Sequence, residues 1–152
     1  MLDIKIRKLA IEDAEQISNI YSEITQKSAQ IDFKRIIAQD ARRSEDACFV
    51  AELDGKIVGF MISYILNLGF GIEKSAWIAT FGVRPEYMGQ GIGEVMARKI
   101  FQFYKDEGVD NVYTSVRWDS TDLLSFFKTL GFDRSNFINL RKVLTSHLSE
   151  NK

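Results

Sequence analysis

Hydrophobic and polar residues alternate at the start of the chain and then change to a helical period. Ile4 and Ile6 are separated by a charged residue, which predicts a first strand with one face toward a core. Glu12 and Asp13 follow, in the place where a helix dipole favours acidic residues. Apolar residues then recur at three- and four-residue intervals and predict an amphipathic helix: Ala14, Ile17, Ile20, Tyr21 and Ile24. The same spacing predicts a shorter second helix over roughly Phe33 to Ala41.

The middle of the chain has the pattern of a β-hairpin followed by another strand. Apolar runs from Phe49 to Leu53 and from Ile57 to Leu66 flank Asp54-Gly55, a dipeptide that tolerates the positive φ angles of a tight turn. After a connection over Asn67 to Lys74, which contains two glycines, Ala76 to Val83 is an apolar and aromatic run of strand length.

The second half of the chain begins with a long helical pattern. From Gly91 the apolar residues follow a period of 3.6, and Gly108 stands where such a helix stops. Val109 to Val116 is then predicted as a strand, Ser120 to Leu130 as a short helix and Phe137 to Leu144 as a final, alternating strand.

Composition indicates one globular domain. The chain has 152 residues, of which 45% are apolar and 27% charged, and we predict a domain over residues 1–145 with a polar tail at 146–152. Twenty basic and 21 acidic residues nearly cancel, which disfavours nucleic acid or an anionic membrane as a partner. The chain has a single cysteine, Cys48, and shows neither a signal-peptide pattern nor an 18-residue apolar stretch. These features predict a cytoplasmic protein. No pattern indicates a metal site.

Glycines gather where the strand ending at Val83 gives way to a helix, in Met88-Gly89-Gln90-Gly91-Ile92-Gly93. Glycine lets backbone N–H groups approach an anion, and a helix N-terminus adds about half a positive charge, so a pyrophosphate suits this turn. Close packing alone could also explain it. The spacing G-x-G-x-G differs from the dinucleotide fingerprint G-x-G-x-x-G, and the chain has no Gly-Lys-Ser or Gly-Lys-Thr of a Walker loop.

Three segments in this order resemble the GNAT superfamily of N-acetyltransferases: Phe81 to Tyr87, Gly89 to Gly93 and Phe126 to Phe132. The resemblance extends from Ile4 to about Leu144, although Met88 stands where the family usually has Arg or Gln. It implies an α/β (α+β) fold with a mixed, mostly antiparallel sheet, splayed between strands 4 and 5 and flanked by about four helices. Strands 4 and 5 would be Ala76 to Val83 and Asn111 to Val116, with acetyl-CoA in the gap between them.

The resemblance also implies a set of residues that bind the cosubstrate. The fourth strand would pair with the pantetheine arm, the glycine turn would hold the pyrophosphate, and the late helix would complete the site. The predicted cofactor-binding residues are Phe81, Gly82, Val83, Met88, Gly89, Gln90, Gly91, Ile92, Gly93, Ser120 and Phe127. Many relatives have a tyrosine at the position of Phe127 that protonates the departing thiolate. Phenylalanine has no such proton, so Ser120, Tyr87 or water would serve, or the thiolate would leave unassisted.

The expected activity is transfer of an acetyl group from acetyl-CoA to a primary amine, by direct attack in a ternary complex. The amine could belong to a small molecule, an amino-acid derivative or a protein. Attack needs a base for the ammonium proton and a donor for the oxyanion; the backbone near Phe81 to Val83 is the expected donor. Glu52, Glu73 and Asp119 lie near predicted strand ends and are alternative bases. The alternative function is a noncatalytic acyl-CoA-binding or sensing domain. Relatives often dimerise through late strands, which makes a homodimer a further expectation.

Overall fold

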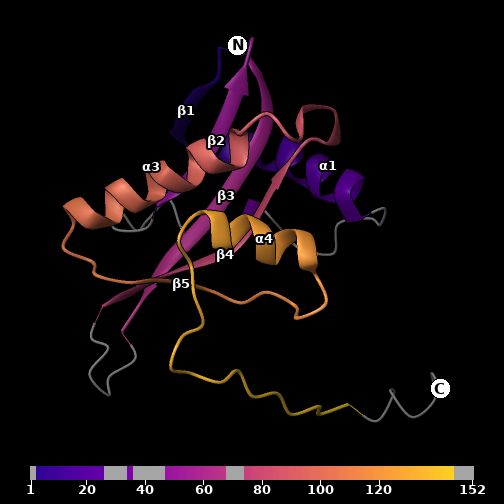
Figure 1. Ribbon diagram of the computed structural model, residues 1–152. Helices are drawn as coiled ribbons and strands as arrows, with labels where there is room; N and C mark the ends of the chain where they lie inside the picture. The colour runs from indigo at the N-terminus through magenta and orange to yellow at the C-terminus, as the bar shows by residue number, and fades with distance from the viewer. Residues whose placement is uncertain (1–2, 26–33, 36–46, 68–73, 146–152) are drawn as a thin grey trace.

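A five-stranded sheet forms the centre of the computed structural model, which describes residues 3–25, 34–35, 47–67 and 74–145 (Figure 1). The strands lie in the order β1 to β5, with antiparallel pairing up to β4 and parallel pairing of β4 with β5. They are β1 (Lys5–Lys8), β2 (Cys48–Leu53), β3 (Lys56–Leu66), β4 (Ser75–Val83) and β5 (Val112–Thr114). This is the mixed, mostly antiparallel sheet that the resemblance implies.

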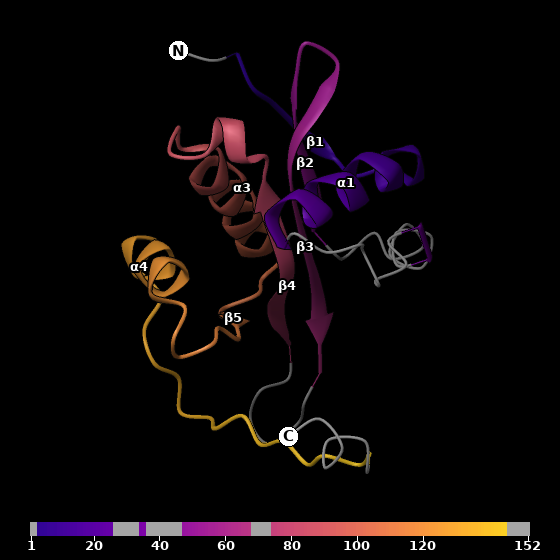
Figure 2. The same ribbon diagram turned by 90° about the vertical axis from the view of Figure 1, so that its right-hand side faces the viewer.

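Helices cover both faces of this sheet (Figure 2). They are α1 (Ala14–Thr25), α3 (Ile92–Asp106) and α4 (Thr121–Thr129), with short 3-10 turns η1 (Ile11–Asp13) and η2 (Pro85–Tyr87). Ile17 and Ile20 of α1 pack with Val50 of β2 on one face, because alternate residues of a strand point to opposite faces. The opposite face packs against α3. The helix predicted over Phe33 to Ala41 lies, except for residues 34–35, outside the described residues.

The predicted hairpin is confirmed. Asp54 and Gly55 have φ angles of 51° and 79°, and strands β2 and β3 pair on either side of them. Two central residues with positive φ match the right-handed twist of the strands that they join. The hairpin therefore places β2 beside β3, whose other edge pairs with β4.

Strands β4 and β5 part after a short stretch of pairing, as the resemblance implies. β5 pairs only with Ala76, Trp77 and Ile78. The Thr114 hydroxyl then donates to the Ile78 carbonyl oxygen at 3.0 Å. A bulge at the next residue, Ala79, shifts the register with β3. Residues 79–83 of β4 consequently keep β3 on one edge and have no β5 partner on the other.

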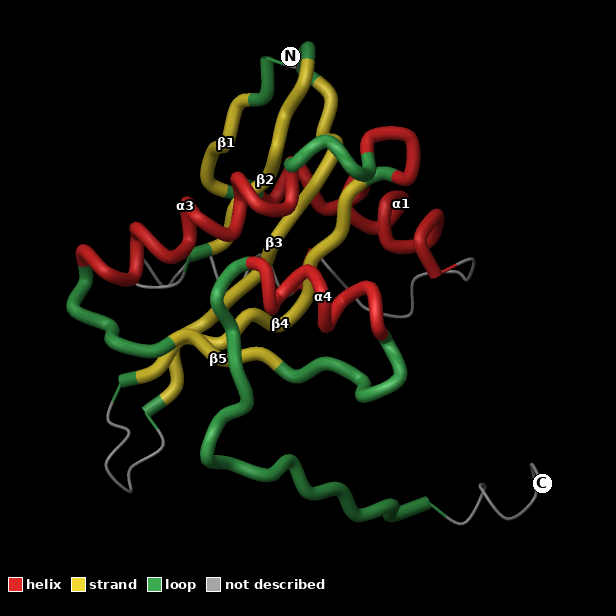
Figure 3. The backbone as a smooth tube through the Cα atoms, viewed as in Figure 1, coloured by secondary structure: helices red, strands yellow, loops and turns green. Residues whose placement is uncertain are grey.

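The final strand predicted at Phe137 to Leu144 is wrong. This segment forms no strand and leaves the body of the protein after α4 (Figure 3). Ile138, Leu140 and Leu144 are 85–87% exposed. Alternation describes one strand, but a strand also needs an adjacent backbone with which to pair. The strand predicted at Val109 to Val116 is likewise shorter than expected, since β5 covers only Val112–Thr114.

A partly buried ion pair joins β1 to η1, the turn that precedes α1. The Arg7 guanidinium donates to both carboxylate oxygens of Asp13 at 2.9 Å, and Ala10 N–H donates to the same carboxylate at 2.8 Å. Burial of Asp13 opposes its ionisation, but these hydrogen bonds outweigh burial and lower its pKa. Because the folded pKa lies below the unfolded value, the pair stabilises the fold above about pH 4 and loses its effect below it.

We therefore expect Asp13→Asn to lower the free energy of unfolding by about 1.5–3 kcal/mol at pH 7, the range for hydrogen bonds to charged groups. The loss should shrink as the pH approaches 2–3. Urea unfolding of both proteins across pH 2.5–7 measures this, with exposed Asp110→Asn as the control. An equal loss at every pH would contradict the ionic contribution.

Candidate functional site

The glycine turn joins the end of β4 to the start of α3. Gly89 and Gly91 have φ angles of 80° and 81°, and Gly91 is the N-cap of α3. A Cβ atom at either glycine would have no atom within 4 Å, so these positions require glycine for their backbone conformation rather than for lack of space. The first N–H groups of α3 have no partners within the helix and carry the positive end of its dipole. The turn thus has the geometry of an anion site.

Gly93 serves a different purpose in the same turn. A Cβ atom there would lie 3.2–3.3 Å from the ring of Phe126, so the missing side chain lets α4 approach the first turn of α3. The glycine pattern predicted an anion site, but sequence alone did not distinguish the conformational glycines from this packing glycine.

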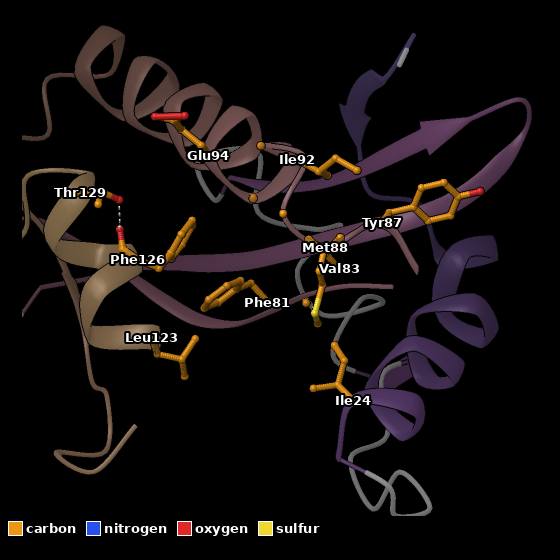
Figure 4. Close-up of a pocket in the computed structure, with 14 residues that line it drawn as sticks. Ile24, Phe81, Val83, Tyr87, Met88, Ile92, Glu94, Leu123, Phe126 and Thr129 are labelled. Atoms are coloured by element: carbon orange, nitrogen blue, oxygen red, sulfur yellow. Dashed lines mark hydrogen bonds between the residues drawn. The ribbon is translucent and has the colours of Figure 1, made fainter. Parts of the chain in front are cut away.

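A cavity of about 590 Å³ lies beside the turn (Figure 4). It is bounded by α1, the unpaired edge of β4, the turn itself and α4. Its lining is mostly apolar, and Glu94 is the one charged residue that the described chain contributes to it. The lining residues are Ile24, Phe81, Gly82, Val83, Tyr87, Met88, Gly89, Gly91, Ile92, Gly93, Glu94, Leu123, Phe126 and Thr129.

Main-chain groups of β4 face this cavity at alternate residues. Arg84 N–H donates to the Val58 carbonyl oxygen of β3 at 2.8 Å. Because successive residues of a strand direct their main-chain groups to opposite edges, Gly82 faces β3, whereas Phe81 and Val83 face the open edge. Two peptide groups without a strand partner are therefore available at a cavity wall.

Most residues predicted to bind the cosubstrate lie at this cavity. Its lining includes eight of them: Phe81, Gly82, Val83, Met88, Gly89, Gly91, Ile92 and Gly93. Gln90, Ser120 and Phe127 are not among the lining residues. Ser120 is the N-cap residue of α4 but makes no side-chain cap hydrogen bond.

Phe127 belongs to an aromatic cluster behind the cavity wall and is only 4% exposed. Its ring lies 5.4 Å from that of Phe81 and 5.0 Å from that of Phe132. Its neighbour Phe126 stacks on Phe81 at 5.5 Å and reaches the cavity. Sequence reasoning selected Phe127 by its position before Gly131 and missed Phe126, since two adjacent aromatic residues of a helix give no signal about which one faces a ligand.

Neither Glu52 nor Asp119, the two candidate bases among the described residues, lines the cavity. Glu52 accepts a hydrogen bond from Arg7 at 3.1 Å and does not line the cavity. Asp119, on the surface, accepts hydrogen bonds from Arg117 at 2.9 and 3.0 Å, and these lower its pKa and its strength as a base. Glu73 lies outside the described residues. Within the described ranges, no three His, Cys, Asp or Glu residues form a group that could hold a metal ion.

Comparison with known proteins establishes the family. The model of the Acetyltransferase (GNAT) family matches residues 14–132, which is most of the chain. The chain belongs to this family. In the part of this GNAT chain that is described, no helix combines the length and the apolar character needed to cross a membrane.

Curated relatives of this GNAT chain are similar in sequence over part or most of their length. An uncharacterized N-acetyltransferase of Methanocaldococcus jannaschii is 33% identical over 99 residues, covering 64% of this chain and 43% of that protein. An N-alpha-acetyltransferase of Sulfurisphaera tokodaii is 25% identical over 138 residues, covering 86% of this chain and 80% of that protein. The match thus spans less than half of the first relative's length.

Solved structures confirm the GNAT fold. An aminoglycoside acetyltransferase from an uncultured soil metagenomic sample superposes with a TM-score of 0.78 at 23% identity, covering 93% of this chain and 97% of that one. An aminoglycoside N-acetyltransferase in complex with CoA gives a TM-score of 0.79 at 13% identity, covering 92% and 94%. At these identities the likeness concerns the fold.

The anion site can be tested with two glycines of nearly equal geometry. Gly91 and Gly108 have φ angles of 81° and 79°, and neither has an atom near its Cβ position. Alanine at either should cost about 1–2 kcal/mol of stability, because the left-handed conformation strains an L residue. Only Gly91→Ala should also weaken CoA binding, by about tenfold or 1.4 kcal/mol.

Calorimetric titration with CoA and thermal unfolding of the two variants measure both effects. Equal CoA affinity in Gly91→Ala and Gly108→Ala would show that the turn does not bind the pyrophosphate.

Proposed function

We propose that this protein is an acetyl-CoA-dependent N-acetyltransferase that acts on a primary amine. The observation that carries the proposal is the position of the unpaired edge of β4 next to the glycine turn, on a single cavity. The turn suits a pyrophosphate. The edge suits the amides of a pantetheine arm, which can pair with a strand as another strand would.

The two open peptide groups of β4 would bind different parts of the cosubstrate. Val83 lies next to the turn, and Phe81 lies two residues or about 6.6 Å farther along the strand, at about 3.3 Å per residue. A cosubstrate whose pyrophosphate occupies the turn would pass Val83 first and bring its thioester toward Phe81. The Phe81 N–H would then donate to the carbonyl oxygen as negative charge develops on it.

The reaction is attack of the neutral amine on the thioester carbon. A C–N bond forms, the C–S bond breaks, the amine proton goes to a base or to water, and CoA leaves as thiolate or thiol. Glu52, Glu73 and Asp119 remain the proposed alternative bases. An ordinary thiol has a pKa of about 8.5, so the CoA thiolate can leave without a proton donor. Tyr87 lines the cavity but directs its hydroxyl away from Phe81 (Figure 4), which favours unassisted departure or a water molecule.

The names of relatives supply the first acceptors to test. The Sulfurisphaera tokodaii relative is named an N-alpha-acetyltransferase, and so is a Mycobacterium tuberculosis relative that is 34% identical over 84 residues. Solved structures that share this fold include aminoglycoside acetyltransferases. Peptide α-amines and small-molecule amines are therefore both proposed acceptors.

The second candidate function is a noncatalytic acyl-CoA-binding or sensing domain. It is favoured by Phe127, which has no hydroxyl and is buried, and by the absence of Glu52 and Asp119 from the cavity lining. Both functions require CoA binding. They differ in turnover.

An assay of thiol release separates the two functions. We expect acetyl-CoA with at least one member of a panel of peptide α-amines, lysine peptides and small-molecule amines to release thiol faster than acetyl-CoA alone. Mass spectrometry of the acceptor should show an added acetyl group. Tight binding of acetyl-CoA without acceptor-dependent release across the panel would establish the sensing domain instead.

A homodimer is proposed as the assembly. The segment predicted as a final strand is apolar, extended and exposed, and β5 is an edge strand of the sheet. Such an edge and an unpaired segment can pair between two copies. Sedimentation equilibrium should give twice the chain mass of 17.4 kDa, and Leu140→Glu should shift it toward the monomer. A monomer at all concentrations would contradict this assembly.

A further inference from the structure

Ile24 ends the apolar stripe of α1 but does not join the core. The preceding members of the stripe, Ala14, Ile17 and Ile20, are buried. Ile24 follows Ile20 by four residues and so lies on the same face of the helix, yet it is 37% exposed. Its side chain lines the cavity instead (Figure 4).

Gly82 allows Ile24 to lie directly against β4. A Cβ atom on Gly82 would stand 2.7 Å from Cδ1 of Ile24 and 3.1 Å from the ring of Phe60. Real Cβ atoms do not approach another carbon so closely, so a side chain at residue 82 would displace the end of Ile24 from this position. The end of Ile24 therefore covers the strand between the open peptide groups of Phe81 and Val83.

Aromatic rings form the opposite wall of the cavity, on the α4 side of the β4 edge. The ring of Phe81 stacks on Phe126 at 5.5 Å with an interplanar angle of 23°. Phe127 packs edge-on against both of these rings. An acyl chain that extends from a carbonyl at the Phe81 N–H toward α1 meets Ile24, which forms the wall on that side.

We propose that Ile24 sets the acyl-chain length of this site and restricts it to acetyl. This inference rests on the proposed function, because it uses the thioester position beside Phe81. This role requires that the methyl group of acetyl fit between the carbonyl and Ile24, and that the two additional methylenes of a butyryl group meet the Ile24 side chain. Apolar pockets discriminate by about 10–200-fold per methylene when the fit is tight.

The experiment compares Ile24→Ala with wild type in calorimetric binding of CoA, acetyl-CoA and butyryl-CoA. Wild type should bind butyryl-CoA at least about tenfold more weakly than acetyl-CoA, and Ile24→Ala should reduce this ratio by at least about tenfold. Affinity for CoA, which has no acyl chain, should change less than about threefold. Ile11→Ala is the matched control, since Ile11 is 40% exposed and does not line the cavity.

The preference for acetyl-CoA over butyryl-CoA should appear equally in the ratio of their kcat/KM values, measured with any acceptor that the protein acetylates. An unchanged butyryl-to-acetyl ratio in Ile24→Ala would overturn the role of Ile24 and leave the proposed function intact. A parallel loss of affinity for all three ligands would also overturn it, because Ile24 would then contact the pantetheine arm. Failure of wild type to bind CoA would instead remove the proposed function itself.

Discussion

The parting of β4 from β5 after Ile78 is the constraint on which the site depends. A peptide group in a protein interior needs a hydrogen-bond partner, and leaving one unpaired costs about 1–3 kcal/mol. β4 avoids this cost at Phe81 and Val83 because their open edge faces a cavity, where water or a ligand can pair with them. The fold thus keeps two strand-like binding groups in place before any ligand arrives.

Packing on both sides of the sheet holds this edge in position. Arg84, directly after β4, is buried, and its guanidinium donates to the Ile57 carbonyl oxygen and to the Glu23 carboxylate, both at 2.9 Å. These contacts join the end of β4 to β3 and to α1. Removing one of the partners would leave a buried cation unpaired, which is strongly destabilising. On the other face, Phe126 packs against Phe81 and close to Gly93. The glycine turn is therefore fixed between the helices that bound the cavity.

Features that depend on local backbone chemistry were predictable from the sequence. Asp54-Gly55 specifies a tight turn whatever lies around it, and the glycines before α3 specify a backbone with positive φ. Features that depend on a distant partner were not. The alternation of Phe137 to Leu144 predicted a strand, but no neighbouring backbone pairs with it. Ile24 fits the stripe of α1 equally well as a core residue, and only the contact above Gly82 places it at the cavity.

The same distinction between local and distant features explains which residues of the candidate site were predicted. The cavity residues from β4 and the turn were predicted because they are consecutive and belong to one motif. Leu123 and Phe126 come from a helix far along the chain, and their exposure to the cavity follows from how α4 packs. The base cannot be chosen from charge alone, since Glu52 and Asp119 both have arginine partners.

Residue-resolved amide hydrogen exchange of β4 tests the central claim most directly. Acetyl-CoA should slow exchange at Phe81 and Val83, whose N–H groups face the open edge, and should leave Gly82 nearly unchanged, because its N–H faces β3. Slower exchange at Gly82 alone, or no change at any of the three residues under saturating acetyl-CoA, would contradict the account.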